Sequence, residues 1–171
     1  MTLQELFWSK GYEFYPTDKD THHSYLTIYD ELFCKWQQAP INILEVGTYK
    51  GGSMLLFEDY FTQANIIGYD IVAPSVPLKR AKVIIRNFYG IDTNDLPEIT
   101  IAIDDASHDI NDQVKFVQMV YPKMVKGGLL IVEDVRAGFE PHFDALGIPY
   151  TSVNFRPHKD EDNDRILIFR I

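Results

Sequence analysis

The stretch that decides the fold is INILEVGTYKGGS, residues 41–53. Four mostly apolar residues lead into Glu45 and Val46, then come Gly47, three other residues and two more glycines, after which Ser53 begins an apolar segment with helical spacing. This order predicts a strand, a tight turn and a helix. Glycine lacks the Cβ that would keep a ligand away from the backbone N–H groups of such a turn, so we expect a small ligand here.

The spacing of the glycines indicates which ligand this is. A dinucleotide fingerprint requires G-x-G-x-x-G, and here the middle glycine is missing. The pattern Glu45-x-Gly47-x-x-x-Gly51 instead resembles motif I of class I S-adenosylmethionine (SAM) methyltransferases, whose glycines make room for the methionine and ribose of SAM. Asp70 ends the next predicted strand about twenty residues later, where a carboxylate can accept both ribose hydroxyls.

The composition favours one small domain and disfavours several kinds of partner. A chain of 171 residues is expected to form a single domain. Its 16 basic and 25 acidic residues give a net charge of −9, the opposite of what a surface that neutralises phosphates requires. No apolar run approaches the ~18 residues of a membrane span, and a single cysteine suits a reducing compartment. We therefore expect a cytoplasmic protein that binds neither nucleic acid nor a membrane.

Helices and strands are predicted to alternate around the glycine turn. An aromatic-rich segment over 1–16 precedes a helix that is expected to begin at Thr17 or Asp18 and to end before Pro40. Further helices are predicted over 110–120 and 139–146. The predicted strands begin at Ile41 and continue over 65–71, 82–86, 99–104, 129–132, 150–156 and 165–171.

Five parallel strands followed by an antiparallel hairpin define the predicted fold class. It is a Rossmann-like, doubly wound α/β fold with a seven-stranded, mostly parallel sheet, and it resembles class I methyltransferases, whose strand order is 3-2-1-4-5-7-6. We expect one methyltransferase domain over 1–171, with an N-terminal aromatic segment and helix over 1–40 and the core over 41–171. A homo-oligomer is also expected, because the N-terminal aromatic residues would otherwise leave an apolar patch exposed.

Acidic side chains follow the fourth and fifth predicted strands. Asp104, Asp105 and His108 come after the fourth strand, and Glu133 and Asp134 come after the fifth. Open α/β sheets bind ligands at the carboxyl ends of their parallel strands, so these groups should meet beside the SAM site. Two like charges ~4 Å apart repel by about 4 kcal/mol at an effective dielectric near 20. The cluster therefore requires a proton, a salt bridge or a cation, and oxygen ligands favour Mg²⁺ over Mn²⁺ or Ca²⁺.

Five segments within roughly residues 17–135 carry a resemblance to one family. The segments TDKDTHHSY, ILEVGTYKGGS, IIGYDI, IDDASHD and YPKMVKGGLLIVEDV resemble the macrocin and mycinamicin sugar O-methyltransferases and, more loosely, the cephalosporin-hydroxylase-like group. The resemblance implies that Asp105, Glu133 and Asp134 bind Mg²⁺ and that His108 is the catalytic base.

The chain departs from that family at two points near the expected cofactor. Ala106 stands where the family usually has glycine, and Arg86-Asn87-Phe88 stands where a Gly-Asp-Gln adenine reader would be expected. The residues predicted to bind SAM are Glu45, Gly47, Tyr49, Gly51, Asp70, Asn87 and Asp104.

The predicted activity is transfer of a methyl group from SAM to a hydroxyl of a sugar or similar polyol. A cation would lower the pKa of that hydroxyl, and the imidazole of His108, with an unperturbed pKa of about 6.5, can accept its proton at neutral pH. Two alternatives stay open: a catechol-type Mg²⁺-dependent O-methyltransferase, and a non-catalytic SAM-binding accessory subunit. Catechol enzymes usually end the fifth strand in Asp-Asn, whereas this chain has Glu133-Asp134.

Overall fold

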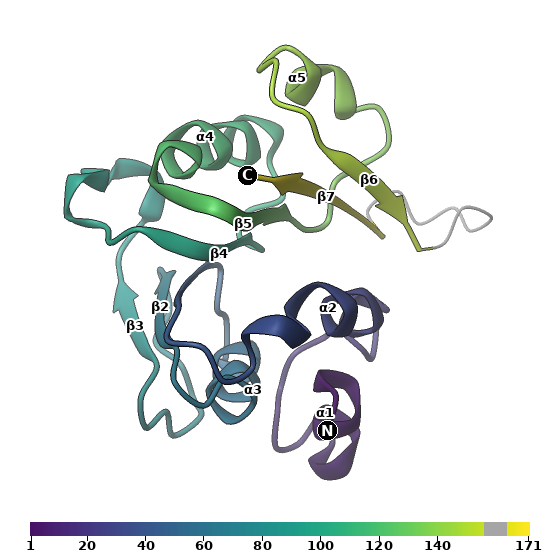
Figure 1. Cartoon of the computed structure of the whole chain (residues 1–171), viewed down its shortest axis with the longest axis vertical. Helices are drawn as coiled ribbons and strands as arrows, with labels where there is room; N and C mark the ends of the chain where they lie inside the picture. Colours follow the sequence, from purple (N-terminus) through teal and green to yellow (C-terminus); the bar gives the residue numbers. More distant parts are fainter. Residues whose placement is uncertain (156–163) are drawn as a thin grey trace.

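The computed structural model describes residues 1–155 and 164–171, in which seven strands form one sheet (Figure 1). The strand order is β3-β2-β1-β4-β5-β7-β6. Strands β1 to β5 pair in parallel, whereas β7 pairs antiparallel with both β5 and β6. The strands are β1 (Asn42–Val46), β2 (Asn65–Asp70), β3 (Lys82–Ile85), β4 (Ile99–Asp104), β5 (Met124–Val132), β6 (Thr151–Asn154) and β7 (Arg165–Arg170). This order confirms the predicted class I methyltransferase arrangement.

Side chains alternate between two cores along the central strands. Ile43 of β1 and Ile131 of β5 belong to one buried cluster, whereas their neighbours Leu44 and Leu130 belong to the other. A strand buried on both faces needs apolar residues at successive positions, as the continuous run in β5 indicates. The sheet is therefore the middle layer of three.

Helices cover both faces of the sheet, with α1, α2 and α3 on one face and α4 and α5 on the other (Figure 1). Their bounds are α1 (Leu3–Lys10), α2 (Tyr25–Phe33), α3 (Gly52–Tyr60), α4 (Ile110–Val120) and α5 (Glu140–Asp144). The chain crosses from one face to the other between β1 and β4, and such a switch point opens a crevice at the carboxyl ends of the strands.

The helix before the first strand begins later than the sequence predicts. It starts at Tyr25 and not at Thr17 or Asp18, because the Asp18 carbonyl accepts hydrogen bonds from the N–H groups of residues 21–23 and folds this segment into turns. The turns carry the side chain of Lys19 into the interior, where it is fully buried.

The fifth strand begins earlier than the sequence predicts. The sequence predicts a turn at Gly127 and Gly128 before a strand that starts at residue 129, but both glycines lie inside β5, where the pairing with β4 shifts register. A Cβ on Gly128 would lie 2.8 Å from the Thr100 carbonyl oxygen, so this irregular pairing requires glycine. The strand still ends at Val132, as predicted.

At the two ends of the chain the structure matches the sequence predictions in part. Phe7 and Tyr15 are buried in the core, whereas Trp8, Tyr12 and Phe14 are exposed. Near the C-terminus, the predicted helix shortens to α5 and the predicted hairpin becomes β6 and β7. The sequence also predicts a polar turn over 158–164 between these two strands, and of this turn the structure describes only residue 164.

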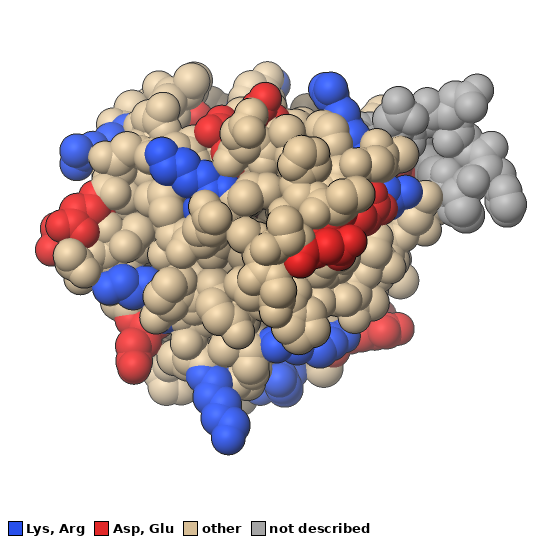
Figure 2. Space-filling view, turned by 90° about the horizontal axis from the view of Figure 1, so that it is seen from above, with Lys and Arg blue, Asp and Glu red and all other residues tan. Residues whose placement is uncertain are grey.

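The molecular face shown in Figure 2 carries acidic and basic side chains scattered among neutral ones. No continuous basic area is visible among the described residues on that face. Within the described ranges, every helix is too short or too polar to cross a membrane.

Candidate functional site

The exits of β1, β4 and β5 are held together by backbone hydrogen bonds that continue the sheet pairing. The N–H of Asp105 donates to the Val46 carbonyl at 2.8 Å, and the N–H of Glu133 donates to the Asp104 carbonyl at 2.9 Å. The acidic residues after β4 and β5 therefore leave the sheet beside the glycine turn after β1, as the topology predicts.

The glycines of the turn are required by the protein itself. Gly47 has φ +86°, and a Cβ there would lie 2.0 Å from the Asp105 carbonyl oxygen. Gly51 has φ +85°, and a Cβ there would lie 2.8 Å from the Cβ of Pro74. The sequence argument that these glycines make room for a ligand is thus incomplete, because they also let the turn pack against the β4 exit and the link after β2.

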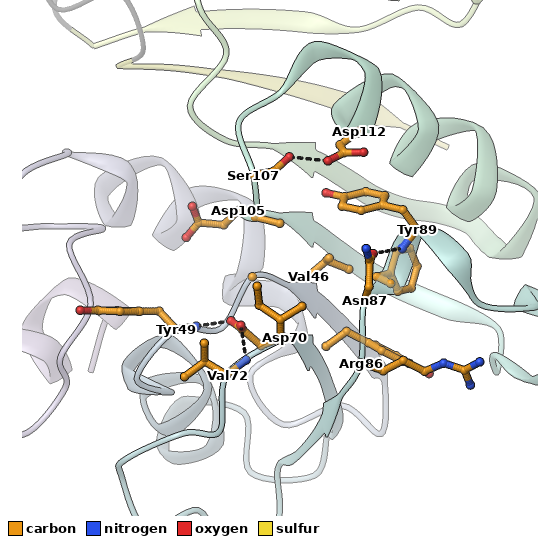
Figure 3. Close-up of a pocket in the computed structure, with 15 residues that line it drawn as sticks. Val46, Tyr49, Asp70, Val72, Arg86, Asn87, Tyr89, Asp105, Ser107 and Asp112 are labelled. Atoms are coloured by element: carbon orange, nitrogen blue, oxygen red, sulfur yellow. Dashed lines mark hydrogen bonds between the residues drawn. The ribbon is translucent and has the colours of Figure 1, made fainter.

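A cavity of about 360 Å³ opens over this turn and is lined from the ends of β1, β2, β3 and β4 (Figure 3). Asp70 lies at its base. Its Oδ2 accepts hydrogen bonds from the N–H groups of Thr48 at 2.7 Å and Tyr49 at 2.6 Å, and its Oδ1 accepts one from Val72 at 2.9 Å. A carboxylate has about four acceptor positions, so Asp70 keeps about one that is free for a ligand, and its role as the ribose acceptor stays a prediction.

The far end of the cavity contains groups that the sequence argument did not single out. Tyr89 and Asp112 line it, and the Ser107 hydroxyl donates to Asp112 Oδ2 at 2.7 Å. Asn87, which was predicted, also lines the cavity, and its Oδ1 accepts the N–H of Tyr89 at 2.9 Å. Figure 3 shows the Arg86 guanidinium pointing away from the other labelled side chains.

Of the predicted cofactor residues, Glu45, Gly51 and Asp104 do not line the cavity, and the two acids among them are buried. Asp104 is 2% exposed and accepts a hydrogen bond from the Tyr89 hydroxyl at 2.9 Å. Glu45 is fully buried, and its Oε2 accepts one from the Ser53 hydroxyl at 2.7 Å. Burial raises the pKa of each carboxyl to about 7, although Lys19 opposes the shift at Glu45 and Tyr89 opposes it at Asp104. In this structure both residues support the walls of the site.

Asp105, His108 and Asp134 converge at the strand ends, where one ligand atom from each lies within 4.8 Å of the others. His108 Nε2 is 3.4 Å from Asp105 Oδ1 and 3.1 Å from Asp134 Oδ2. Two carboxylates and an imidazole at this separation could hold a divalent cation. The sequence predicted that these residues meet, but as two ligands and a base.

Glu133 belongs to the same cluster but faces inward. Lys19 Nζ donates to its Oε1 at 2.8 Å and to its Oε2 at 2.7 Å, and the Tyr29 hydroxyl also donates to Oε1. The same ammonium donates to Asp105 Oδ2 at 2.6 Å. The role of Glu133 as a metal ligand stays a prediction, because its carboxylate is engaged by Lys19 and Tyr29.

Sequence reasoning missed Lys19. It lies in the TDKDTHHSY segment, but a lysine between two aspartates is typical of an exposed turn, and lysine is almost never fully buried unless paired. Only its three-dimensional partners, which are 86 and 114 residues away, reveal it.

Other donors from the N-terminal segment reach the cluster. The Tyr25 hydroxyl donates to Asp134 Oδ1 at 2.6 Å, and His23 Nε2 lies 3.4 Å from the same oxygen. His23 Nδ1 also contacts Asp164 Oδ1 at 2.9 Å. The turn after Thr17 and the start of α2 therefore form one side of the acidic site.

These contacts set the ionisation of the cluster. Burial disfavours the charged form of Asp105, but Lys19 and His108 outweigh it and lower the pKa of that carboxyl. The hydrogen bond to Asp105 raises the pKa of His108, which burial opposes and Asp134 reinforces. Burial raises the pKa of Glu133 well above its usual range in spite of Lys19. A proton on His108 and the Lys19 ammonium thus balance the acids when no metal ion is bound.

Backbone strain is concentrated at this site. Among the described residues, those other than glycine with positive φ are Tyr49 at 46°, His108 at 55° and Asp134 at 53°. Left-handed conformations of such residues are costly and cluster at functional sites. Tyr49 borders the cavity described above, and the other two residues contact each other.

A second cavity, of about 280 Å³, lies on the other side of the glycine turn. It shares Gly47, Tyr49 and Asp105 with the first cavity, and Tyr12 and His108 also line it. The acidic cluster therefore stands at the boundary between two cavities, as a reaction between two bound molecules requires.

The sheet order, the glycine turn and the cavity over it define the class I SAM methyltransferases, and this chain has that fold. Comparison with known proteins supports this assignment through individual relatives. No protein-family model matches the chain. Its sequence is nevertheless related to the sugar O-methyltransferases that act on macrolides and tetracenomycins.

Three curated relatives illustrate the relationship. Mycinamicin VI 2''-O-methyltransferase of Micromonospora griseorubida is 30% identical over 74% of this chain and 35% of its own length. Demethylmacrocin O-methyltransferase of Streptomyces fradiae is 28% identical over 84% and 43%. A rhamnosyl tetracenomycin-C 2'-O-methyltransferase of Streptomyces olivaceus is 26% identical over 74% and 37%. The chain thus spans about two fifths or less of the length of these relatives.

Solved structures extend the comparison to three dimensions. A methyltransferase of mycinamycin biosynthesis, solved with Mg, SAH and mycinamycin VI, superposes with a TM-score of 0.68 at 26% identity, over 78% of this chain and 37% of that one. A ribosomal RNA methyltransferase from Plasmodium falciparum has a TM-score of 0.62 at 15% identity, over 85% and 93%. The second likeness concerns the fold alone.

Proposed function

We propose that this chain is a Mg²⁺-dependent SAM O-methyltransferase that transfers a methyl group to a hydroxyl of a sugar or a similar polyol. The observation that carries the proposal is the convergence of Asp105, His108 and Asp134 beside the cavity over Gly47. We further propose that residues 1–171 act as one methyltransferase domain.

The cavity of about 360 Å³ over the glycine turn is the proposed SAM site. Asp70 would accept a ribose hydroxyl at its remaining acceptor position, while Tyr49 and Asn87 line the same space. Three predicted residues do not line this cavity and would instead support the residues that do: Glu45, Gly51 and Asp104. The solved relative that contains SAH supports this assignment, since it shares the fold.

The donor set fits a magnesium ion. Asp105 Oδ1 and Asp134 Oδ2 face the same imidazole from two strand ends, and carboxylate oxygens are the ligands that Mg²⁺ prefers. Glu133 would be the third protein ligand if its carboxylate shares its lone pairs between Lys19 and the ion. When bound, the cation would lower the pKa of an acceptor hydroxyl and orient it.

His108 is the proposed base. Its side chain is 34% exposed and lines the second cavity, so it can reach an acceptor bound there. A cation between Asp105 and Asp134 would compensate the negative charges of these carboxylates, which now raise the pKa of His108. The neutral ring could then remove the hydroxyl proton as the methyl group is transferred.

The acceptor proposed for the second cavity is a small molecule with hydroxyl groups. Its volume of about 280 Å³ is in the range of small-molecule sites, and a solved relative is described in complex with mycinamycin VI. A homo-oligomer and a cytoplasmic location stay predictions. The exposed side chains of Trp8, Tyr12 and Phe14 are the surface that would support the first.

One assay separates the proposal from its alternatives. The purified chain is incubated with SAM and with panels of hexoses, nucleotide sugars, glycosylated macrolides and catechols, and SAH is measured by mass spectrometry with Mg²⁺ or with EDTA. Mg²⁺-dependent turnover of a sugar is the expected result. Turnover of catechols alone indicates the catechol-type enzyme, SAH binding without any turnover indicates an accessory subunit, and turnover in EDTA contradicts the metal site.

A further inference from the structure

Lys19 is a fully buried cation among three acidic residues. Its Nζ lies 2.6 Å from Asp105 Oδ2, 2.7 Å from Glu133 Oε2 and 3.4 Å from Glu45 Oε1. A buried ammonium is tolerated only where it is paired and hydrogen-bonded. Among the described residues, no other lysine or arginine pairs with these carboxylates. Lys19 is therefore their main counter-charge.

The carboxylate of Asp105 is shared between two sides of the site. Its Oδ2 accepts the ammonium from the inner side, and its Oδ1 faces His108 at 3.4 Å on the outer side. Because Lys19 fixes one oxygen, it also fixes the direction of the other. That second oxygen belongs to the group that could hold a metal ion.

The turn that carries Lys19 is anchored through Tyr25. The N–H of Tyr25 donates to the Lys19 carbonyl at 2.9 Å, and the Tyr25 hydroxyl reaches Asp134 on the opposite side of the cluster. The segment that contains Lys19 and Tyr25 precedes β1, yet its side chains contact the exits of both β4 and β5. Docking of this segment and the shape of the acidic site are therefore linked.

We propose that Lys19 is a positioning residue, a built-in counter-ion that keeps Asp105 and Glu133 in place before a metal ion binds and turns Asp105 Oδ1 toward the cation site. This inference rests on the proposed function at one point only, because it takes Asp105 as a metal ligand. Its structural part can be tested without methyl transfer, so the two can fail separately.

The first measurement is thermal unfolding in EDTA. Lys19→Met removes the charge but keeps the length of the side chain, and should lower the midpoint by roughly 10 °C, as expected when one partner of a buried pair is lost in a domain of this size. Lys19→Arg should lose less. The double variant Lys19→Met with Glu133→Gln removes one charge of each sign, so it should regain most of the loss.

A matched control is Lys10→Met, which removes a lysine paired with Asp59 at 2.8 Å on the surface and should shift the midpoint little. The proposal is overturned if Lys19→Met melts like this control, or if the double variant is no more stable than Lys19→Met. Should Lys19→Met fail to fold, the double variant and Lys19→Arg still decide the question.

The second measurement is the rise in midpoint caused by Mn²⁺, read in the same variants. In Lys19→Met the three inner carboxylates lack their cation, so a divalent ion should raise the midpoint by several degrees more than in the unsubstituted chain. A role in packing alone predicts equal rises, and that result would contradict the proposal. Sugar methylation can fail in the assay above without changing either measurement.

Discussion

His108 Nε2 lies 3.1 Å from Asp134 Oδ2, and both residues have left-handed backbone conformations, with φ of 55° and 53°. Each conformation costs of order 1–3 kcal/mol and persists only where the surroundings impose it. Here the imidazole bridges two carboxylates from different strand ends, and this contact helps to offset the strain. The bridge occupies the space between the proposed metal ligands, so a proton on His108 and a cation at this position are alternatives.

The first prediction concerns that exchange. Without metal, His108 should titrate above its usual pKa of 6.5, because Asp105 and Asp134 stabilise the imidazolium. Saturating Mg²⁺ should lower this pKa, since the ion compensates the same carboxylates. Proton–nitrogen NMR of the imidazole, titrated with EDTA and then with Mg²⁺, measures both values. A midpoint for His108 that is the same in both titrations would rule out a metal site at Asp105 and Asp134.

The second prediction separates the proposed ligands. Asp134→Asn and Asp105→Asn should each weaken Mn²⁺ binding by 10-fold or more, at about 1.4 kcal/mol per factor of ten, because each removes a charged oxygen ligand. SAH affinity should change less. Isothermal titration with each ligand gives both numbers. Asp109→Asn is the control, since this exposed residue near the site caps α4 through Asn111. Loss of SAH binding in parallel with Mn²⁺ binding would indicate general damage to the site.

Much of this architecture could be predicted because it depends on local patterns. The glycine turn, the apolar run of β5 and the acids at the strand ends each occupy a few consecutive residues, and parallel topology then brings their ends together. The helix start at Tyr25 was missed, because Thr17 and Asp18 have the side chains of N-caps but their segment folds into turns held by the Asp18 carbonyl.

The parts that could not be predicted depend on long-range contacts. Neither Lys19 nor Tyr29 differs in sequence from an ordinary surface lysine or core tyrosine, and their role comes from reaching Glu133 across more than 100 residues. The same applies to Asp70, which was expected to accept ribose hydroxyls and which also accepts hydrogen bonds from the backbone of the glycine turn.

The third prediction is that the metal-free protein loses stability between pH 5 and pH 8. The folded-state pKa of Glu45 is raised to about 7 by burial, so the native state binds the proton more tightly than the unfolded chain does. Stability then falls as pH rises through this range, by up to roughly 3 kcal/mol for this residue at about 1.4 kcal/mol per pKa unit. Asp104 and His108 act in the same direction.

Urea denaturation in EDTA at pH 5 and pH 8 measures this loss. Glu45→Gln cannot ionise and should flatten the dependence, whereas Glu31→Gln, on an exposed residue, should leave it unchanged. A protein that is equally stable at both pH values would show that Lys19 keeps these carboxylates ionised throughout.

The fourth prediction concerns the cofactor. Asp70→Ala removes a ribose acceptor and three hydrogen bonds to the backbone, each of the kind worth about 1.5–3 kcal/mol when the acceptor is charged. SAH affinity should fall at least 10-fold, while Mn²⁺ affinity should be retained. Asp92→Ala is the matched control, because Asp92 also accepts a backbone N–H, from Asn94 at 2.9 Å, but does not line the cavity. Unchanged SAH binding in Asp70→Ala would remove the cavity from the cofactor assignment.

The last prediction uses two glycines with the same backbone conformation to separate strain from close packing. Gly47 and Gly138 both have φ +86°, but a Cβ on Gly47 would lie 2.0 Å from the Asp105 carbonyl oxygen, whereas a Cβ on Gly138 meets nothing within 4 Å. Gly138→Ala should therefore cost only the ~1–2 kcal/mol of a left-handed alanine. Gly47→Ala adds a clash with backbone, so it should cost several kcal/mol more and displace the β4 exit that carries Asp105. Urea denaturation compares the two variants, and Mn²⁺ titration of any folded Gly47→Ala protein should show weakened binding. If the two alanine variants are equally stable, the turn and the β4 exit are not packed as described, and Gly47 would then serve the ligand alone.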